Sequence, residues 1–158
     1  MAGNEHEILA EARRMLGGLA FFRKMLAGEL PLPPLAALMG FRLVEVAEGR
    51  VVFEADPLPA YYNGLGSIHG GFFATLLDSA LGSAVNTTMG PGRAYATVDL
   101  KVTLVRPLRR EVGAVRCIAS AVQVGSRIAT SEGRIVDAQD KIYAHGTATC
   151  MAVETQGA

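Results

Sequence analysis

One carboxylate stands alone in a long uncharged stretch of this chain. Between Pro57 and Gly92, Asp78 is the only Asp, Glu, Lys or Arg, and it lies inside the apolar run 72–81. This run, followed by Gly-Pro-Gly at 90–92, predicts a helix over about 71–89 that is apolar on nearly all sides. Such a helix must be surrounded by other elements, and an ionised carboxylate buried within it needs a partner or a chemical role.

Strand patterns lie on both sides of this helix in the sequence. Two come before it, at 41–46 and 50–55, joined by a tight turn at Glu48-Gly49. Four follow it, at 96–104, 111–124, 127–137 and 142–153. Because strands do not alternate with helices, we expect an α+β fold in which a curved antiparallel sheet wraps the central helix. A second subunit would cover the side that the sheet leaves open.

The N-terminal part of the chain has a different pattern. Apolar residues at helical spacing predict a helix over 5–27, weakened in its middle by Gly17-Gly18. The proline-rich stretch 30–34 then predicts a stiff connector. We therefore divide the chain into an N-terminal helix with its connector, 1–35, and one domain, 36–155. Packing of this helix on its own domain is favoured over binding at a membrane surface.

Composition and motifs exclude several classes of function. The 158 residues carry no net charge, so there is no general attraction to nucleic acid. Cys117 and Cys150 have neither metal nor redox spacing, which predicts buried free thiols in a cytoplasmic protein. No apolar run is long enough to span a membrane. The absence of GxSxG, HExxH and P-loop patterns disfavours a Ser-His-Asp hydrolase, a zinc hydrolase and an NTPase, and we expect no metal or cofactor.

The residues that lead into the helix resemble a known family. The runs Asn-Gly-Leu-Gly-Ser-Ile-His-Gly-Gly at 63–71 and Leu-Leu-Asp-Ser-Ala at 76–80 resemble hotdog-fold acyl-CoA thioesterases. Within these, the chain is similar to the phenylacetyl-CoA thioesterase-like branch of the 4-hydroxybenzoyl-CoA thioesterase superfamily. The segments 97–99, 106–107 and 146–149 agree, and the resemblance spans roughly 40–153.

This resemblance implies a homo-oligomer, either a dimer with its sheets joined edge to edge or a dimer of dimers, as in a homotetramer. It places the active sites at the dimer interface, where one subunit offers the helix N-terminus and the other the carboxylate. His69 and Asp78 therefore need not touch within one chain, and about 13 Å of helical rise separates them.

Two residues are the main candidates for the chemistry. Asp78 would activate water as a general base or attack the thioester carbonyl itself; otherwise it is a carboxylate paired for structure. The first N–H groups of a helix have no internal partner, and the resemblance assigns stabilisation of the oxyanion to the Gly70 N–H. The alternative is that Gly70 merely allows a tight turn into the helix.

Three further residues have weaker claims to the site. Asn63 would position the carbonyl or the attacking water, but an Asx turn beside Gly64 is the commoner role for such a residue. His69 would bond the thioester or stabilise the loop. Thr97 aligns with a hydroxyl that holds the attacking water in the family, although it falls on the polar phase of its strand, opposite Val98.

Substrate contacts are expected from a basic cluster and from aromatic residues. Guanidinium groups suit the phosphates of CoA, and the candidates are Arg93, Arg106, Arg109, Arg110 and Arg127. Tyr61, Tyr62, Phe72 and Phe73 are candidates for lining the acyl pocket, although the two phenylalanines fit the core better. Gly71 is a further candidate for contacting the substrate.

The leading hypothesis is an acyl-CoA thioesterase that hydrolyses an aromatic or medium-chain acyl-CoA to the free acid and CoA. One alternative is a non-catalytic binder of acyl-CoA or an aromatic acid on the same fold. A hotdog dehydratase is the other, but the single helical aspartate fits hydrolysis better.

Overall fold

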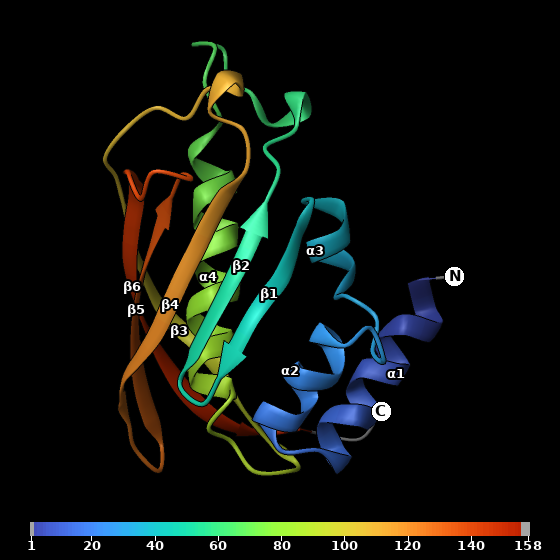
Figure 1. The fold of residues 1–158 in the computed structure, drawn as a ribbon. Helices are drawn as coiled ribbons and strands as arrows, with labels where there is room; N and C mark the ends of the chain where they lie inside the picture. Colours follow the sequence, from blue (N-terminus) through green and yellow to red (C-terminus); the bar gives the residue numbers. More distant parts are fainter. Residues whose placement is uncertain (1, 156–158) are drawn as a thin grey trace.

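A six-stranded antiparallel sheet curls around one long helix in the computed structural model, which describes residues 2–155 (Figure 1). The helix is α4 (Gly70–Asn86), and the strand order β1-β2-β4-β5-β6-β3 makes β1 and β3 the two edges of the sheet. The strands are β1 (Phe41–Ala47), β2 (Arg50–Ala55), β3 (Arg93–Leu104), β4 (Val115–Val124), β5 (Ile128–Val136) and β6 (Ile142–Glu154). The predicted α+β fold with a wrapped central helix is confirmed.

Burial by the sheet fixes the orientation of α4. The side chains that pack into the core are Phe72, Phe73, Leu76, Leu77, Ala80, Leu81, Ala84 and Val85. Full burial of one such large side chain contributes roughly 1.5–3 kcal/mol, so this face holds the helix firmly against the sheet. Thr75, Asp78, Ser79 and Ser83 are only partly buried, and they give α4 a second, more polar face.

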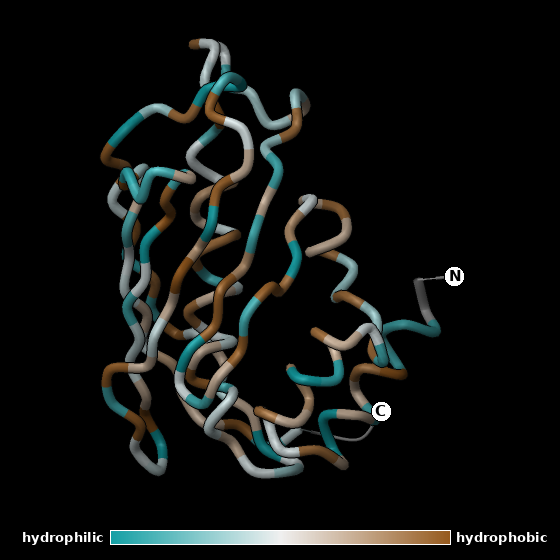
Figure 2. The backbone as a smooth tube through the Cα atoms, viewed as in Figure 1, coloured by the Kyte–Doolittle hydropathy of each residue, from teal (hydrophilic) through white to brown (hydrophobic). Residues whose placement is uncertain are grey.

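The strands follow the predicted pattern except at two starts, since β3 begins at Arg93, three residues before the predicted position, and β4 begins late. Hydropathy alternates along much of the sheet, as expected for strands with one face on the core (Figure 2). The predicted strand 111–124 begins only at Val115, because residues 110–112 form a short 3-10 helix, η2 (Arg110–Val112). Gly113 follows with a φ of +77°, a conformation that ends regular structure and that glycine adopts readily.

The single N-terminal helix predicted over 5–27 is wrong, because two helices occupy this region. They are α1 (Ala2–Met15) and α2 (Gly18–Leu26), and the chain breaks between them where α2 meets the end of α4. The Gly18 N–H donates to the Met89 carbonyl at 2.7 Å, and a Cβ on Gly18 would lie 1.7 Å from the Asn86 carbonyl oxygen. This tertiary contact overrides the helical periodicity.

The N-terminal helices sit beside β1, on one side of the wrapped helix (Figure 1). After the proline-rich connector, a short helix α3 (Pro34–Leu38) begins with Pro34, a favourable first position because proline has no N–H to satisfy. Among residues 2–155, no helix is long and apolar enough to cross a membrane.

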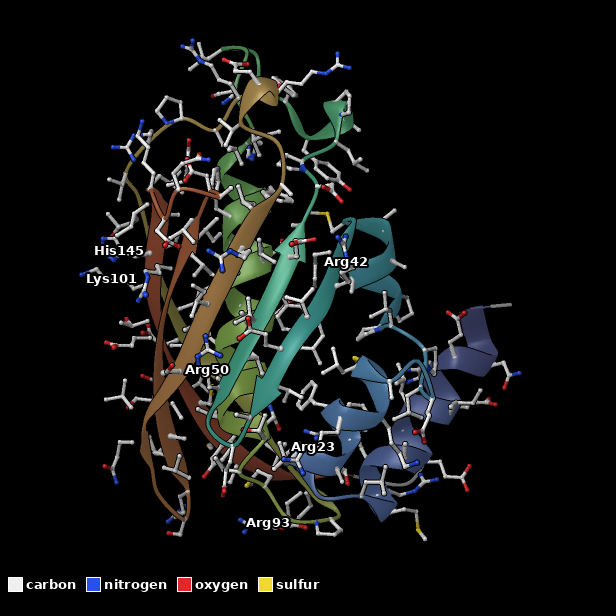
Figure 3. All side chains as sticks on the ribbon, viewed as in Figure 1. Arg23, Arg42, Arg50, Arg93, Lys101 and His145 are labelled. Atoms are coloured by element: carbon white, nitrogen blue, oxygen red, sulfur yellow. The ribbon has the colours of Figure 1, made fainter. Side chains whose placement is uncertain are left out.

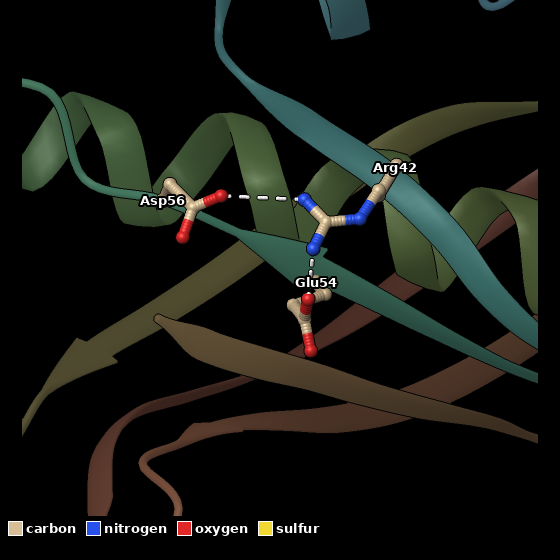
Figure 4. Close-up of polar contacts among 3 residues, drawn as sticks. All are labelled: Arg42, Glu54 and Asp56. Atoms are coloured by element: carbon tan, nitrogen blue, oxygen red, sulfur yellow. Dashed lines mark hydrogen bonds and ion pairs between the residues drawn. The ribbon is translucent and has the colours of Figure 1, made fainter. Parts of the chain in front are cut away.

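A small charge network ties β1 to β2 at this edge (Figure 4). The Arg42 guanidinium pairs with Glu54 on the neighbouring strand and, at 3.3 Å, with Asp56 just beyond it. These side chains are largely exposed, so the network contributes little stability. It does place charge along the β1 side, whereas exposed Val98 and Leu104 lie on β3 at the opposite edge.

Candidate active site

Asp78 lies on α4 with a buried carboxylate oxygen that has no partner. Its Oδ1 is inaccessible to solvent and accepts no hydrogen bond from any described residue. The hypothesis that this carboxylate is paired for structure within its own chain therefore fails for Oδ1. An unsatisfied buried oxygen of this kind costs about 1–3 kcal/mol, and such groups occur where a protein has a chemical use for them.

Thr97 faces the same region from β3. Its Oγ1 lies 3.9 Å from the Cys150 Sγ on β6, and a Cβ on Gly82 would lie 3.6 Å from that hydroxyl. Gly82 is one helical turn after Asp78, so the hydroxyl and the carboxylate lie on the same side of α4.

A β-bulge explains how Thr97, which is exposed in the single chain, faces α4 although Leu100 and Val102 lie on the core side as well. Thr97 pairs with Cys150 and Asp99 pairs with Thr149, so Val98 is an extra residue in β3. A single inserted residue reverses the alternation of side chains, which the regular two-residue period of the sequence does not reveal. The expectation that Thr97 falls on the polar phase of its strand, opposite Val98, therefore misses this change of side.

The cysteine beside this pair is a buried thiol. Burial raises the pKa of Cys150, the negative charge of Asp78 raises it further, and the hydrogen bond with Thr97 opposes both effects. Cys117 is also buried, and burial raises its pKa too. Both thiols are free and buried, as predicted. Buried thiols of this kind are unreactive. The sequence did not indicate that Cys150 lies beside Thr97.

The first turn of α4 provides a free backbone donor. His69 caps the helix, since its Nδ1 accepts a hydrogen bond from the Gly71 N–H at 2.9 Å. The Gly70 N–H donates no hydrogen bond to any residue in 2–155. A Cβ on Gly70 would approach Leu104 Cδ1 to 3.0 Å, so glycine also suits the close packing here. Gly70 thus presents an unused N–H at a helix N-terminus, where negative charge is favoured.

Asn63 uses its side-chain amide within its own loop. Its Oδ1 accepts the N–H groups of Leu65 at 2.8 Å and Ser67 at 3.2 Å, and its Nδ2 donates to the Ser67 hydroxyl at 3.1 Å. This arrangement is an Asx turn, the commoner role for an asparagine that precedes a glycine. In this structure Asn63 shapes the loop that leads into α4.

Two hollows flank the start of α4. The first, the Gly70 hollow, has a volume of about 220 Å³ and is lined by Asn63, Gly70, Leu104 and Arg106, among others. The second, of about 360 Å³, is lined by Tyr62, His69, Gly71 and Thr75 on the neighbouring side. Of the predicted substrate contacts, Tyr61, Tyr62 and Gly71 line the second hollow. Phe72 and Phe73 are buried in the core, and each also borders a hollow, the second and the Gly70 hollow respectively.

The candidate CoA-binding arginines divide into two groups within one chain. Arg106, Arg109 and Arg110 lie near the first turn of α4, where Arg106 also donates to the Ile142 carbonyl at 2.5 Å and stacks over Tyr143. Arg93 lies at the opposite end of the molecule and pairs with Glu154 (Figure 3). Arg127 is exposed in the turn beside it. Lys101 projects to the outside of the sheet (Figure 3).

One chain does not bring its own donor and carboxylate together. Gly70 and Asp78 are eight residues apart on one straight helix, which separates them by about 12 Å along its axis. Within residues 2–155, moreover, no cluster of His, Cys, Asp or Glu side chains could hold a metal ion. Within one chain, therefore, the Gly70 N–H and the Asp78 carboxylate cannot contact the same carbonyl group.

A match to a family model shows the protein family to which this chain belongs. The model of the thioesterase superfamily matches residues 65–144, which include α4, Thr97 and part of the lining of both hollows. The chain belongs to the thioesterase superfamily. A protein of Halobacterium salinarum whose name proposes an esterase is 32% identical over 118 residues, covering 72% of this chain and 76% of that protein.

Solved structures agree with this membership. A phenylacetic acid degradation-related protein of Ralstonia eutropha, whose name proposes a thioesterase, has a TM-score of 0.75 at 28% identity, covering 82% of this chain and 98% of its own. A mutant of the phenylacetic acid degradation protein PaaI of Thermus thermophilus has a TM-score of 0.67 at 28% identity, covering 75% of this chain and 97% of its own. The hotdog fold and the family resemblance are confirmed, and thioester hydrolysis is the chemistry that the family supports.

Proposed function

We propose that this protein is an acyl-CoA thioesterase that releases a free aromatic or medium-chain acid and CoA. Thioester hydrolysis follows the family, and the aromatic preference is supported by the names of two similar structures, both linked to phenylacetic acid degradation. The observation that carries the proposal is the unpartnered Asp78 Oδ1 on the same helix that presents the free Gly70 N–H. Attack on a carbonyl uses both groups: the carboxylate acts as base or nucleophile, and the N–H stabilises the oxyanion.

In this proposal, a second copy of the chain completes each active site. Two antiparallel α4 helices that place Gly70 of each copy against Asp78 of the other have their two-fold axis at residue 74, midway between them. Thr75, beside that axis, lies on the partly exposed face of α4. Strand β3 is an unpaired edge with exposed Val98 and Leu104, which suits edge-to-edge pairing in a dimer or a dimer of dimers.

Hydrolysis at this composite site follows from the groups present. Negative charge develops on the thioester oxygen as the carbonyl is attacked, and the Gly70 N–H at the helix N-terminus stabilises it. Asp78 accepts a proton from a water held by Thr97, the new C–O bond forms, and the C–S bond breaks. The departing CoA thiolate then takes up the proton. In the alternative, Asp78 itself attacks and water hydrolyses the resulting anhydride.

Recognition of CoA falls to the arginines around the Gly70 hollow. Arg106 lines that hollow, and Arg109 and Arg110 are exposed close to it without a carboxylate partner in residues 2–155. Antiparallel pairing of β3 would also bring the Arg93 end of the second copy toward this hollow. Tyr62 and Gly71 would then contact the acyl end from the neighbouring hollow.

A panel of CoA thioesters tests the proposal. Purified protein is incubated with phenylacetyl-, benzoyl-, hexanoyl-, octanoyl- and acetyl-CoA, and release of the free thiol is followed. We expect the highest kcat/KM with the aromatic and medium-chain members and a much lower value with acetyl-CoA. Failure to turn over any member would favour the non-catalytic binder.

A further inference from the structure

A cavity whose lining includes neither Asp78 nor Gly70 lies between the N-terminal helices, the β1 edge and α4. It has a volume of about 210 Å³. Most of its wall is apolar, and the large side chains in that wall are Phe21, Phe22, Met25, Phe41 and Phe53. Three polar side chains also line it, Arg13 from α1 and Ser79 and Ser83 from α4.

Arg13 brings a partly buried positive charge without a carboxylate partner to this apolar cavity. Its guanidinium carbon lies 4.8 Å from the ring centre of Phe21 and 5.6 Å from that of Phe22. Among the described residues, no carboxylate lies within ion-pair distance of it. Burial lowers the pKa of Arg13, which reflects the loss of water around the cation. A guanidinium has five N–H donors, and most of these have no protein acceptor here.

Within residues 2–155, the Arg13 side chain makes one hydrogen bond, which leaves most of its donors without a protein acceptor. Its Nη2 donates to the Asn86 Oδ1 at 2.6 Å. That same oxygen already accepts the Tyr95 N–H at 2.9 Å, and the Asn86 Nδ2 donates to the carbonyls of Gly82 and Tyr95. Without Arg13, both polar atoms of the Asn86 side chain would still have hydrogen-bond partners. The Arg13 guanidinium is therefore available for another acceptor.

We propose that this cavity binds a free apolar monocarboxylic acid, with its carboxylate on Arg13 and its ring or short chain among the phenylalanines. A cavity of roughly 150 Å³ suffices for benzene, so about 210 Å³ accommodates a single-ring or medium-chain acid. Guanidinium and carboxylate form paired charge-assisted hydrogen bonds, which an amide or alcohol of the same shape does not reproduce. The Ser79 and Ser83 hydroxyls would supply further donors. The inference stands on the cavity alone and does not require thioester hydrolysis.

Calorimetric titration of the whole protein tests this site. Phenylacetate and hexanoate are compared with phenylacetamide and hexanamide, which have nearly the same shape and no charge. We expect both acids to bind at least tenfold more tightly than their amides, a difference of about 1.4 kcal/mol. Equal affinity of acid and amide would contradict a carboxylate contact.

Substitutions locate the bound acid. Arg13→Met keeps the apolar stem and removes the charge, whereas Ser83→Leu keeps the charge and fills the cavity from a helical position that tolerates leucine. Both should weaken phenylacetate binding at least tenfold. Arg106→Met, the matched control at the Gly70 hollow, should leave binding unchanged.

The outcomes separate the possible sites. If Arg13→Met proves unstable by thermal denaturation, Ser83→Leu, in which the arginine stays, decides the question. Unchanged affinity in Ser83→Leu overturns the proposal, and so does loss of binding in Arg106→Met alone, which would place the acid beside Gly70. The absence of turnover in the thioester panel would leave the expected result of this titration unaltered.

Discussion

His69 caps α4 by accepting the Gly71 N–H on Nδ1 at 2.9 Å, and this contact leaves the neighbouring Gly70 N–H as the free donor of the helix N-terminus. The cap requires a neutral imidazole, because both ring nitrogens of a protonated histidine are donors. The histidine thus acts on the first turn of the helix, whose alignment determines where the Gly70 N–H points.

The cap leads to a prediction that separates helix capping by His69 from a direct part of its imidazole in the reaction. His69→Ala should lower the free energy of unfolding by about 1 kcal/mol, the usual value of a helix cap. His69→Asn, which also caps, should recover that stability and keep most of the turnover. Chemical denaturation and the thioesterase assay measure the two effects. A stable but inactive His69→Asn variant would show that the imidazole takes part in the reaction itself.

Asp78→Asn should abolish most turnover without harming the fold. Loss of a general base lowers kcat by about 10²–10⁴-fold. The Oδ1 atom accepts no hydrogen bond from any residue in 2–155, so the free energy of unfolding should stay the same or rise. Activity and denaturation are measured on the same preparation. Wild-type rates in this variant would remove Asp78 from the mechanism, and a large loss of stability would indicate a structural partner.

Thr97 offers a matched pair of substitutions. Thr97→Ser keeps the hydroxyl, and Thr97→Val keeps the shape against Gly82 and Cys150. If the hydroxyl holds the attacking water, Thr97→Val should lower kcat by about tenfold or more, in the range of a lost hydrogen bond, with KM little changed. Thr97→Ser should retain most of the activity. Equal rates in both variants would limit Thr97 to packing.

The junction between α2 and α4 makes a stability prediction with a built-in control. Gly18→Ala places a Cβ against the Asn86 carbonyl and should lower the free energy of unfolding by about 2 kcal/mol or more. At Gly17 a Cβ would lie 3.5 Å from the Met89 oxygen, an ordinary contact, so Gly17→Ala should change stability by about 0.5 kcal/mol or less. Similar losses in both variants would contradict this packing of the N-terminal helices.

The sequence allowed prediction of the features that depend on local pattern. The apolar run around Asp78 predicted α4, and alternating residues predicted the strands and the α+β class. The Asx turn at Asn63 was one of the two roles expected for that residue, because it involves residues two to four apart. A structural role for His69 was also an alternative, but the helix cap that it forms was not predicted.

Features that depend on distant contacts were not predictable in this way. The break at Gly17 arises from packing on the end of α4, and the inward turn of Thr97 arises from a bulge opposite β6. The Arg13 cavity joins residues from several elements, and an arginine in an apolar helical stretch was its only sequence signal. The pairing of Gly70 with Asp78 stays a prediction, since one chain holds them about 12 Å apart along a helix.

Complementation between two inactive variants tests the composite site most directly. Gly70→Pro removes the proposed oxyanion donor at a first helical position where proline fits, and His69 already has the extended backbone that a following proline requires. Gly70→Ala, the control, keeps the N–H while introducing the same approach to Leu104, and it should stay active.

Gly70→Pro and Asp78→Asn are purified separately, mixed in equal amounts, unfolded and refolded together, and then assayed for thiol release. If each site takes its donor from one copy and its carboxylate from the other, about half of the dimers are hybrids with one intact site. The mixture should then regain roughly one quarter of wild-type activity. A mixture as inactive as its two components would contradict the shared site.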